Sequence, residues 1–432
     1  MDKFLFLPTP RKLPPQIPHG LYHYMREVDG SFTRFHLRVE PDGRGMLMAN
    51  ASAAARLSPV GVRMAKGLLD GETKDQILNE TRQRFRGASP GAMVEDYHLI
   101  ENLIISLSLP GDNYPIVNLE DPEISPFDIE LMAPWQADLP LASPHETIAI
   151  LDRLWEIGIP HVTIFVPPEL DPDYLIQTIE RAEDLGMIAG VRARATDLNV
   201  TGLLDDISMA GIDYITLLVA SNTAMLHDSL AGVDDLAKVW PLFAAMLECE
   251  IAPVAELPLT RRTTAELEVT LERLLEAQVH NVNFVAYAIP DILAIEENED
   301  FLPASSLPQV ADMVEEMASE LEVRFIWQPP VGGDPNISLG EQIVRGPRCS
   351  DDASIRVNAN GDVIPPRGAS QIAGNLLTDD WEKIWSNTSF VRYRERLERP
   401  TRCDECPGMA ICAADCPRNV SGWSTSSGGY DR

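Results

Sequence analysis

The stretch HVTIFVPPELDPDYLIQTIERAEDLGMIAGVRAR, residues 161–194, decides the fold class of this 432-residue chain. It opens with a short apolar run and continues into a segment whose apolar residues recur at three- and four-residue steps. It closes on a second apolar run. The two runs are typical of buried strands, and the middle segment is typical of an amphipathic helix that ends at Gly186. A strand, a helix and a strand in this order predict a parallel sheet with the helix packed outside it.

The same alternation extends from residue 127 to residue 330. Further apolar runs cover residues 128–132, 214–220, 252–259, 282–289 and 323–327. About six strand–helix units are too few for a closed eight-stranded barrel. We therefore expect an α/β fold with a partial (βα)6 TIM-like barrel, in which chemistry is placed at the carboxyl ends of the strands.

The chain before the barrel predicts two further regions. Residues 1–34 are rich in proline and aromatic residues, show little periodicity and are expected to form an N-terminal extension. In residues 35–110, two alternating segments joined by the turn PDGRG (41–45) precede three helical segments, of which Ser58 and Thr73 would cap the first two. Two strands and three helices predict a winged-helix-like domain.

The charge of the chain excludes several classes of partner. Lys and Arg number 35 and Asp and Glu number 66, which gives a net charge of −31. Such a surface repels nucleic acids and anionic lipids, so we expect neither a nucleic-acid nor a membrane-surface partner. The chain has neither an apolar run of about 18 residues nor a secretory signal at its start, so we expect a cytoplasmic protein.

The cysteines indicate a metal site. Four of the six lie close together, at Cys403, Cys406, Cys412 and Cys416, and Cys349 stands upstream. In a reducing compartment, clustered cysteines indicate metal ligation rather than disulfides. Thiolates suit either zinc or an iron–sulfur cluster.

The spacing C-x2-C-x5-C-x3-C resembles the SPASM domain of radical S-adenosylmethionine (SAM) enzymes, and two upstream segments extend the resemblance. NGDV (360–363) is similar to a hairpin of that family, and GNL (374–376), followed by Trp381 and Trp385, is similar to its GN…W segment. The resemblance implies a small, irregular, cysteine-rich SPASM-like domain over residues 343–432 that binds an iron–sulfur cluster of the 4Fe-4S type.

The resemblance continues toward the N-terminus. Residues 127–330 resemble the radical SAM partial barrel, and Leu226-His227-Asp228 is similar to an element of its loops. The N-terminal domain resembles the leader-peptide-binding protein of pyrroloquinoline quinone biosynthesis over residues 39–52 and 57–71 and at Glu95-Asp96. That family grips ribosomal precursor peptides, so the resemblance implies a peptide maturase with a precursor peptide as its partner.

Two departures from the family concern SAM chemistry. The family needs a C-x3-C-x2-C loop after its first barrel strand, whereas residues 133–143 contain no cysteine. Its GGEP motif, which binds the SAM amino group, is replaced by VPPEL (166–170). Proline lacks the N–H group and fixes φ, so it cannot stand in for a glycine that approaches a ligand. Both losses predict a pseudoenzyme that does not use SAM.

The SPASM ligand set is also incomplete. Its second cysteine position is Pro366 here, and no cysteine follows Cys416. One cluster or zinc ion could be held by the first three cysteines of the quartet, with a fourth ligand from the last, from Cys349 or from a carboxylate. Alternatively, two defective clusters persist with other ligands, or no metal remains.

Polar side chains in the barrel region offer further candidates. Arg192 and Arg194 end the third strand and would bind a carboxylate or an acidic peptide, or else form ion pairs with surface acids. Glu169 and Glu256 are candidate acid–base groups, with structural roles as the alternative.

Three further residues, His227, Asp228 and Cys249, are of chemically reactive types. Adjacent residues of one element point apart, so packing is expected for His227 and Asp228 rather than catalysis. Cys249 is expected to be a buried small apolar residue.

Three functions remain open. The leading hypothesis is a non-catalytic partner that binds a ribosomal precursor peptide or an active radical SAM enzyme, with the metal site stiffening the tail. The alternatives are a peptide-modifying or redox enzyme with an auxiliary iron–sulfur cluster, and an iron–sulfur electron carrier.

Overall fold

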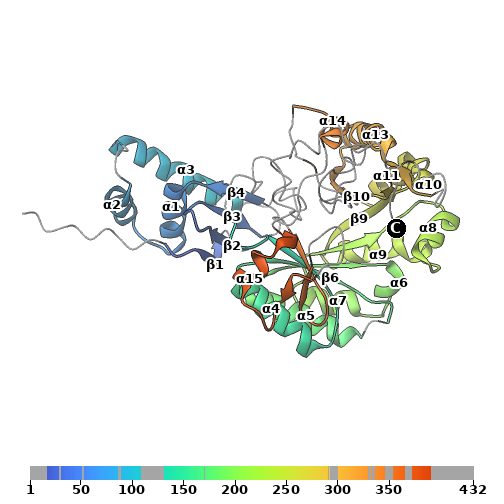
Figure 1. Ribbon diagram of the computed structural model, residues 1–432, viewed down its shortest axis with the longest axis horizontal. Coiled ribbons are helices and arrows are strands. Elements are labelled where there is room, and N and C mark those ends of the chain that lie inside the picture. Colours follow the sequence, from blue (N-terminus) through green and yellow to red (C-terminus); the bar gives the residue numbers. More distant parts are fainter. Residues whose placement is uncertain are drawn as a thin grey trace, which may run out of the picture. The chain divides into compact units, whose positions relative to one another are not determined.

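The computed structural model describes most of the chain up to residue 390. The described residues are 17–28, 31–50, 53–85, 89–108, 131–169, 171–289, 291, 300–328, 331, 336–345, 354–364 and 372–390. The chain divides into two compact units, Met1–Asp112 and Asn113–Arg432, which we describe separately (Figure 1). None of the described helices is long and apolar enough to cross a membrane.

The first unit begins with a four-stranded antiparallel sheet in the order β1-β2-β3-β4. Its strands are β1 (Gly20–Val28), β2 (Ser31–Val39), β3 (Gly45–Ala49) and β4 (Ala53–Leu57). The expected extension over residues 1–34 is therefore wrong from Gly20 onward, because β1 pairs with β2 along its whole length. Polar residues alternate there with Tyr22 and Tyr24, which pack on the apolar core, so the segment lacks the apolar run that reveals a strand.

Three helices complete the first unit: α1 (Pro59–Leu69), α2 (Lys74–Arg84) and α3 (Pro90–Ser108). The predicted caps are confirmed. The Ser58 hydroxyl accepts a hydrogen bond from Gly61 N at 3.1 Å, and Thr73 forms a capping box with Gln76. Each cap satisfies backbone N–H groups that the first turn of a helix leaves without a partner.

The second unit is built on a ten-stranded sheet in the order β13-β10-β9-β8-β7-β6-β5-β14-β15-β16. The strands are β5 (Gln136–Pro140), β6 (His161–Phe165), β7 (Ile188–Ala193), β8 (Tyr214–Leu218), β9 (Ala252–Leu259), β10 (Asn281–Ala286), β13 (Arg324–Gln328), β14 (Ser354–Val357), β15 (Asp362–Ile364) and β16 (Gly374–Asn375). Neighbours from β13 to β14 are parallel, and only the last two pairings are antiparallel. The predicted α/β fold with a large parallel sheet is confirmed.

Helices connect the parallel strands and flank the sheet (Figure 1). They are α4 (Pro144–Glu156), α5 (Pro172–Leu185), α6 (Ala195–Leu198), α7 (Leu203–Met209), α8 (Ala224–Ala231), α9 (Leu236–Glu248), α10 (Arg261–Thr264), α11 (Leu267–Glu276), α13 (Leu307–Glu320) and α14 (Leu339–Val344). Short elements near the last strands are β11 (Ala288–Ile289), β12 (Leu302–Pro303) and the 3-10 helix η2 (Ala304–Ser306). Apolar side chains of the helices and of the strands they cover form one continuous core.

The first strand of this sheet is not where the sequence pattern placed it. The predicted strand at 128–132 lies partly outside the described residues, and Leu131 and Met132 are not in a strand. The strand is β5, whose Gln136 and Asp138 alternate with Ala137 and Leu139. Because only the latter pair faces the apolar core, β5 has no continuous apolar run by which to recognise it.

The described part of the tail belongs to the second unit. β14 pairs in parallel with β5, and the short helix α15 (Trp381–Trp385) packs on the same core. The indole N–H groups of Trp381 and Trp385 donate to the backbone oxygens of Met132 and Leu131 at 2.8 and 3.1 Å. These two tryptophans thus anchor the tail to the segment that precedes β5.

Candidate functional site

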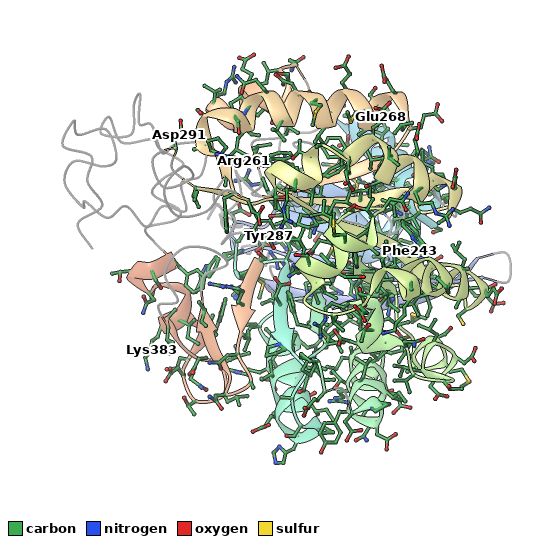
Figure 2. The ribbon with its side chains drawn as sticks, turned by 90° about the vertical axis from the view of Figure 1, so that its right-hand side faces the viewer. Phe243, Arg261, Glu268, Tyr287, Asp291 and Lys383 are labelled. Carbon is green, nitrogen blue, oxygen red and sulfur yellow. The ribbon has the colours of Figure 1, made fainter. Side chains whose placement is uncertain are left out.

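The parallel strands have one apolar face and one polar face. Side chains such as Ala137, Val162 and Val191 alternate toward the core under the helices. The positions between them carry polar groups on the opposite face, which we call the inner face. Its polar side chains from β5 to β9 are Gln136, Asp138, His161, Thr163, Arg192, Tyr214, Thr216 and Glu256. Figure 2 labels Phe243 of α9 and Tyr287, which directly follows β10.

A pocket of about 500 Å³ lies at the carboxyl ends of β6 to β10. This volume is in the range of small-molecule sites. Arg192, Arg194, Glu256 and Asp197 contribute charged groups, while Leu218 and Tyr287 contribute apolar surface. The pocket is where a partial barrel of this kind places its chemistry.

An ion pair between Arg192 and Glu256 lies in the wall of this pocket. The two side chains come from β7 and β9, across β8, and the Arg192 guanidinium donates to Glu256 Oε1. The guanidinium also lies 4.8 Å from the centroid of the Phe165 ring, a cation–π distance. Burial lowers the pKa of Arg192, but the carboxylates of Glu256 and Asp138 outweigh it and raise the pKa overall. Arg192 is therefore a paired cation, and its partner is the buried acid Glu256 rather than an acid on the surface.

Arg194 is also paired. Its Nε and Nη2 donate to the two oxygens of Asp197, both at 2.8 Å, in a fork of the kind that guanidinium and carboxylate prefer. Its Nη1 donates to the carbonyl of Ala231 at 3.1 Å. The contacts of both arginines thus favour the second alternative predicted from the sequence, in which they form ion pairs rather than bind a carboxylate of a guest.

The two candidate carboxylates have different settings. Glu256 is buried and held by Arg192. Glu169 follows β6 on an exposed loop and does not line the pocket. Pro168, from the segment that replaces the family's glycines, does line the pocket.

A chain of hydrogen bonds crosses the inner face beneath the pocket. Tyr214 Oη lies 2.7 Å from His161 Nε2 and 3.2 Å from Thr163 Oγ1. Gln136 Nε2 then donates to Thr163 Oγ1 at 2.9 Å and to Asp138 Oδ1 at 3.2 Å. None of these residues is predicted from the sequence, because single polar residues within apolar strands form no motif. Their signal was the regular alternation of polar side chains along neighbouring strands.

Burial strongly shifts the pKa values of two residues in this hydrogen-bond network. It raises the pKa of Asp138 to about 6, against the opposing effects of Gln136 and Arg192. It lowers the pKa of His161 to about 3, because the charged imidazolium would lose its hydration. His161 is therefore neutral near pH 7, and Asp138 titrates in a range suited to proton transfer.

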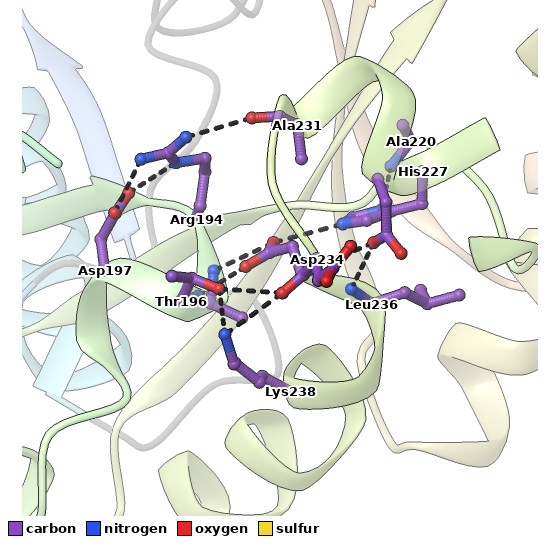
Figure 3. A network of polar contacts seen from close by, with 12 residues as sticks. Arg194, Thr196, Asp197, Ala220, His227, Ala231, Asp234, Leu236 and Lys238 are labelled. Atoms are coloured by element: carbon purple, nitrogen blue, oxygen red, sulfur yellow. Dashed lines mark hydrogen bonds and ion pairs between the residues drawn. The ribbon is translucent and has the colours of Figure 1, made fainter. Parts of the chain in front are cut away.

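A second polar network holds the loops beside the pocket (Figure 3). The buried carboxylate of Asp235 accepts hydrogen bonds from the backbone N–H groups of Ala195 and Thr196 at 3.2 and 2.5 Å. Its Oδ2 lies 3.2 Å from His227 Nε2, while His227 Nδ1 accepts the N–H of Ala220 at 3.1 Å. The packing role expected for His227 fits this buried position.

Asp228 belongs to the same network. Its Oδ1 accepts the backbone N–H groups of Asp235 and Leu236, both at 2.9 Å. These backbone hydrogen bonds hold the pKa of Asp228 below its usual value. Asp228 thus fixes the start of α9, and it does not line the pocket.

Cys249 is less buried than the sequence predicts. It ends α9 and is half-buried rather than fully buried. Its thiol donates to Asp205 Oδ1 at 3.4 Å, and burial together with this carboxylate raises its pKa. A thiol held in its protonated form is a weak metal ligand.

The predicted metal ligands cannot be located in the fold. Cys349, Cys403, Cys406, Cys412 and Cys416 all lie outside the described residues, as does Pro366. Among the residues that are described, no three histidine, cysteine or acidic side chains gather in a way that could hold a metal ion. The metal site therefore remains a prediction from four closely spaced thiols, a donor set suited to zinc or an iron–sulfur cluster.

The strand ends do not fit a SAM cluster. The connection from β5 to α4 is only Leu141, Ala142 and Ser143. It is shorter than a C-x3-C-x2-C motif, and it carries no thiol. Ser143 is already the N-cap of α4, so this connection has no slack in which a cluster loop could form.

Comparison with known proteins identifies the fold alone. No family model matches the chain, and no curated protein matches its sequence. Among solved structures, SuiB of Streptococcus suis bound to SAM is similar over 91% of this chain and 95% of its own, with a TM-score of 0.58 and 12% identity. A second crystal structure of SuiB has a TM-score of 0.56 at 13% identity, over 88% of this chain and 93% of its own. SuiB bound to the precursor peptide SuiA has a TM-score of 0.52 at 12% identity and covers 87% and 94%. The chain therefore shares with SuiB the α/β fold with a large parallel sheet that the sequence predicts.

Proposed function

We propose that this chain is a non-catalytic relative of radical SAM peptide maturases that binds a ribosomal precursor peptide, or an active maturase, in the cytoplasm. The observation that carries the proposal is the three-residue connection from β5 to α4. A radical SAM enzyme places its cluster-binding loop at this position, and neither the length nor the composition of the connection allows one. Peptide binding is supported by the similarity of the fold to SuiB, which one structure describes as bound to the precursor peptide SuiA.

The tail is proposed to keep one metal site. Cys403, Cys406 and Cys412 would supply three thiolates, and Cys416, Cys349 or a carboxylate would supply the fourth ligand. A zinc ion or a 4Fe-4S cluster there would stabilise a segment that has few apolar residues of its own. The first unit, which resembles a leader-peptide-binding protein, is the proposed peptide-binding domain.

The decisive experiment is reductive incubation with SAM. Anaerobically purified protein is mixed with SAM and dithionite, and 5′-deoxyadenosine is measured by chromatography. We expect none above the level without protein. Multiple turnovers would refute the non-catalytic proposal.

Metal content tests the tail. Iron, sulfide and zinc are quantified in the protein as isolated, in Cys406→Ser and in Cys249→Ser. We expect Cys406→Ser to lose most of the bound metal and Cys249→Ser to retain it, because Cys249 pairs with Asp205 in the barrel. Equal metal content in all three proteins would exclude the quartet as the site.

Peptide binding is tested by selection from a displayed library of random peptides. Enriched peptides are synthesised with a fluorescent label and titrated by anisotropy against the full chain. Saturable binding supports the proposal, and a library without enrichment contradicts it.

A second candidate is a peptide-modifying or redox enzyme that uses the auxiliary cluster. The specific observation in its favour is the pocket at the strand ends, because its wall residue Arg192 interacts electrostatically with Asp138, an aspartate whose pKa is raised to about 6. An electron carrier needs no such pocket. Turnover of a selected peptide without SAM, read by mass spectrometry, would establish the enzyme in place of the scaffold.

A further inference from the structure

The pocket at the strand ends has an apolar wall. Leu218 ends β8, and Leu230 of α8 and Pro258 of β9 lie around it. Tyr287 and Phe301 add an aromatic pair whose ring centroids are 6.3 Å apart in an edge-to-face arrangement. Aromatic and aliphatic side chains around a space of about 500 Å³ favour an apolar guest.

The position of Tyr287 is fixed by the backbone. Its N–H donates to the carbonyl of Leu259 at 3.0 Å, and its own carbonyl accepts the N–H of Leu302 at 2.9 Å. Tyr287 is nevertheless 39% exposed. A half-exposed aromatic ring on a fixed backbone is a preformed contact surface that a guest could cover without reorganising the site.

The charges of the pocket are already compensated within the chain. Arg192 pairs with Glu256, and Arg194 pairs with Asp197. Asp300 pairs with Arg262 through two contacts at 2.7 and 2.8 Å. Every charged side chain that lines the pocket, among the described residues, therefore has an ion-pair partner. An anionic or cationic guest would find no unpaired counter-charge there, and we expect a large cost for burying its charge without a partner.

We propose that this pocket binds an uncharged apolar or aromatic side chain of a peptide, and that it selects against carboxylate groups and against SAM. The proposal rests on the proposed peptide-binding function and adds to it the chemical class of the residue that enters the barrel mouth. It also replaces the expectation that Arg192 and Arg194 would recognise an acidic peptide. SAM carries several charged groups, and each would meet a site without a free counter-charge.

The test uses small peptide mimics rather than an unknown peptide. N-acetyl-phenylalanine amide, N-acetyl-leucine amide, N-acetyl-aspartate amide and SAM are titrated into the full chain, with binding followed by ligand-observed NMR. We expect the two apolar amides to bind with a Kd of about 1 mM, which is typical for ligands of this size. The aspartate amide and SAM should bind at least about tenfold more weakly.

Variants locate the site. Tyr287→Ala should raise the Kd of N-acetyl-phenylalanine amide about tenfold, because it removes the aromatic contact. Tyr287→Phe keeps the ring and should bind like the unchanged protein. Asp152→Asn, which breaks a pair with Arg181 on α4 and α5 outside the pocket, should also bind normally. Thermal melts of each variant show that loss of binding is not loss of folding.

Glu256→Gln reverses the selectivity. It removes the carboxylate that neutralises Arg192, so the aspartate amide should gain at least about tenfold in affinity. Aspartate or SAM binding as tight as the apolar amides in the unchanged protein would overturn the proposal, and so would apolar binding that Tyr287→Ala leaves intact. Either result would leave the library selection and SAM-cleavage experiments unaffected, so the two proposals fail independently.

Discussion

The substitution Gly190→Ala should destabilise the second unit, because Gly190 makes room for the ring of Tyr214. Gly190 lies on β7, between Thr163 of β6 and Tyr214 of β8 in the sheet register. The Tyr214 ring crosses β7 on the inner face to reach His161 on β6, with ring centroids 5.6 Å apart. A Cβ on residue 190 would overlap the Cζ, Cε2 and Oη atoms of Tyr214. The ring would therefore have to leave its place.

The magnitude follows from two losses. Overpacking of a filled interior costs about 1–3 kcal/mol. Displacement of the ring also breaks the contacts of Tyr214 Oη with His161 and Thr163, at about 0.5–1.5 kcal/mol each. Replacing glycine by alanine also lowers the conformational entropy of the unfolded chain, which offsets about 0.4–1 kcal/mol of this loss. The net loss is about 3 kcal/mol, or a melting-point decrease of roughly 6 °C for a unit of this size.

The assay is calorimetry, with the transitions of the two units assigned first, because a chain of two units need not unfold in one step. Gly91→Ala is the matched control: its Cβ would meet only Ser89 Oγ, at 4.0 Å. A double variant with Tyr214→Leu tests the cause, because the two changes should be strongly non-additive if the ring is what the methyl displaces. The reasoning would be refuted if the free energy of unfolding of Gly190→Ala lay within about 0.5 kcal/mol of that of the unchanged protein. It would also be refuted if the effects of Gly190→Ala and Tyr214→Leu simply added in the double variant.

Three more predictions follow from buried polar groups and caps. The folded-state pKa of Asp138, about 6, lies above its usual value of 3.8, so its contribution to stability is complete below about pH 4 and is lost as the pH rises through 6. Asp138→Asn should therefore be more stable than the unchanged protein at pH 8 by up to about 3 kcal/mol but not at pH 4. The measurement is urea unfolding at pH 4 and at pH 8, and the same difference in free energy of unfolding at both pH values would contradict the prediction. Asp235→Ala should cost about 4 kcal/mol, because His227 and two backbone N–H groups lose their partner, whereas the exposed neighbour Asp234→Ala should change the melting point little. Thr73→Ala should lower the free energy of unfolding of the first unit by about 1 kcal/mol through loss of its capping box, and an unchanged melting transition of that unit would argue against the cap.

The parts of the fold that were predictable are those with a strong hydrophobic period. The six apolar runs from residue 161 onward coincide with strands β6 to β10 and β13, because apolar residues dominate these runs even though single polar side chains of the inner face interrupt them. Among the strands that were missed, β1 and β5 have polar side chains at alternate positions. Such a segment forms a strand only because of its tertiary contacts, namely pairing with a neighbouring strand or packing on the polar inner face.

The candidate site was predictable in its location and not in its chemistry. The barrel pattern placed Arg192 and Glu256 at strand ends, and both line the pocket. Their pairing with each other was invisible, because they are separated in the sequence and by β8 in the sheet. The roles of Trp381 and Trp385 were likewise unpredictable, since their indole groups donate to backbone oxygens rather than to side chains.

The pairing of β14 with β5 has a consequence for biosynthesis. β5 would emerge early from the ribosome, yet one of its edges finds its partner only when residues 354–356 have been made. At about 5–20 residues per second, this leaves the edge of β5 open for on the order of ten seconds or more. An open edge strand is a template for pairing with other chains. Nascent chains truncated before β14 should therefore aggregate or bind chaperones, which makes completion of the tail the step that protects the barrel during synthesis.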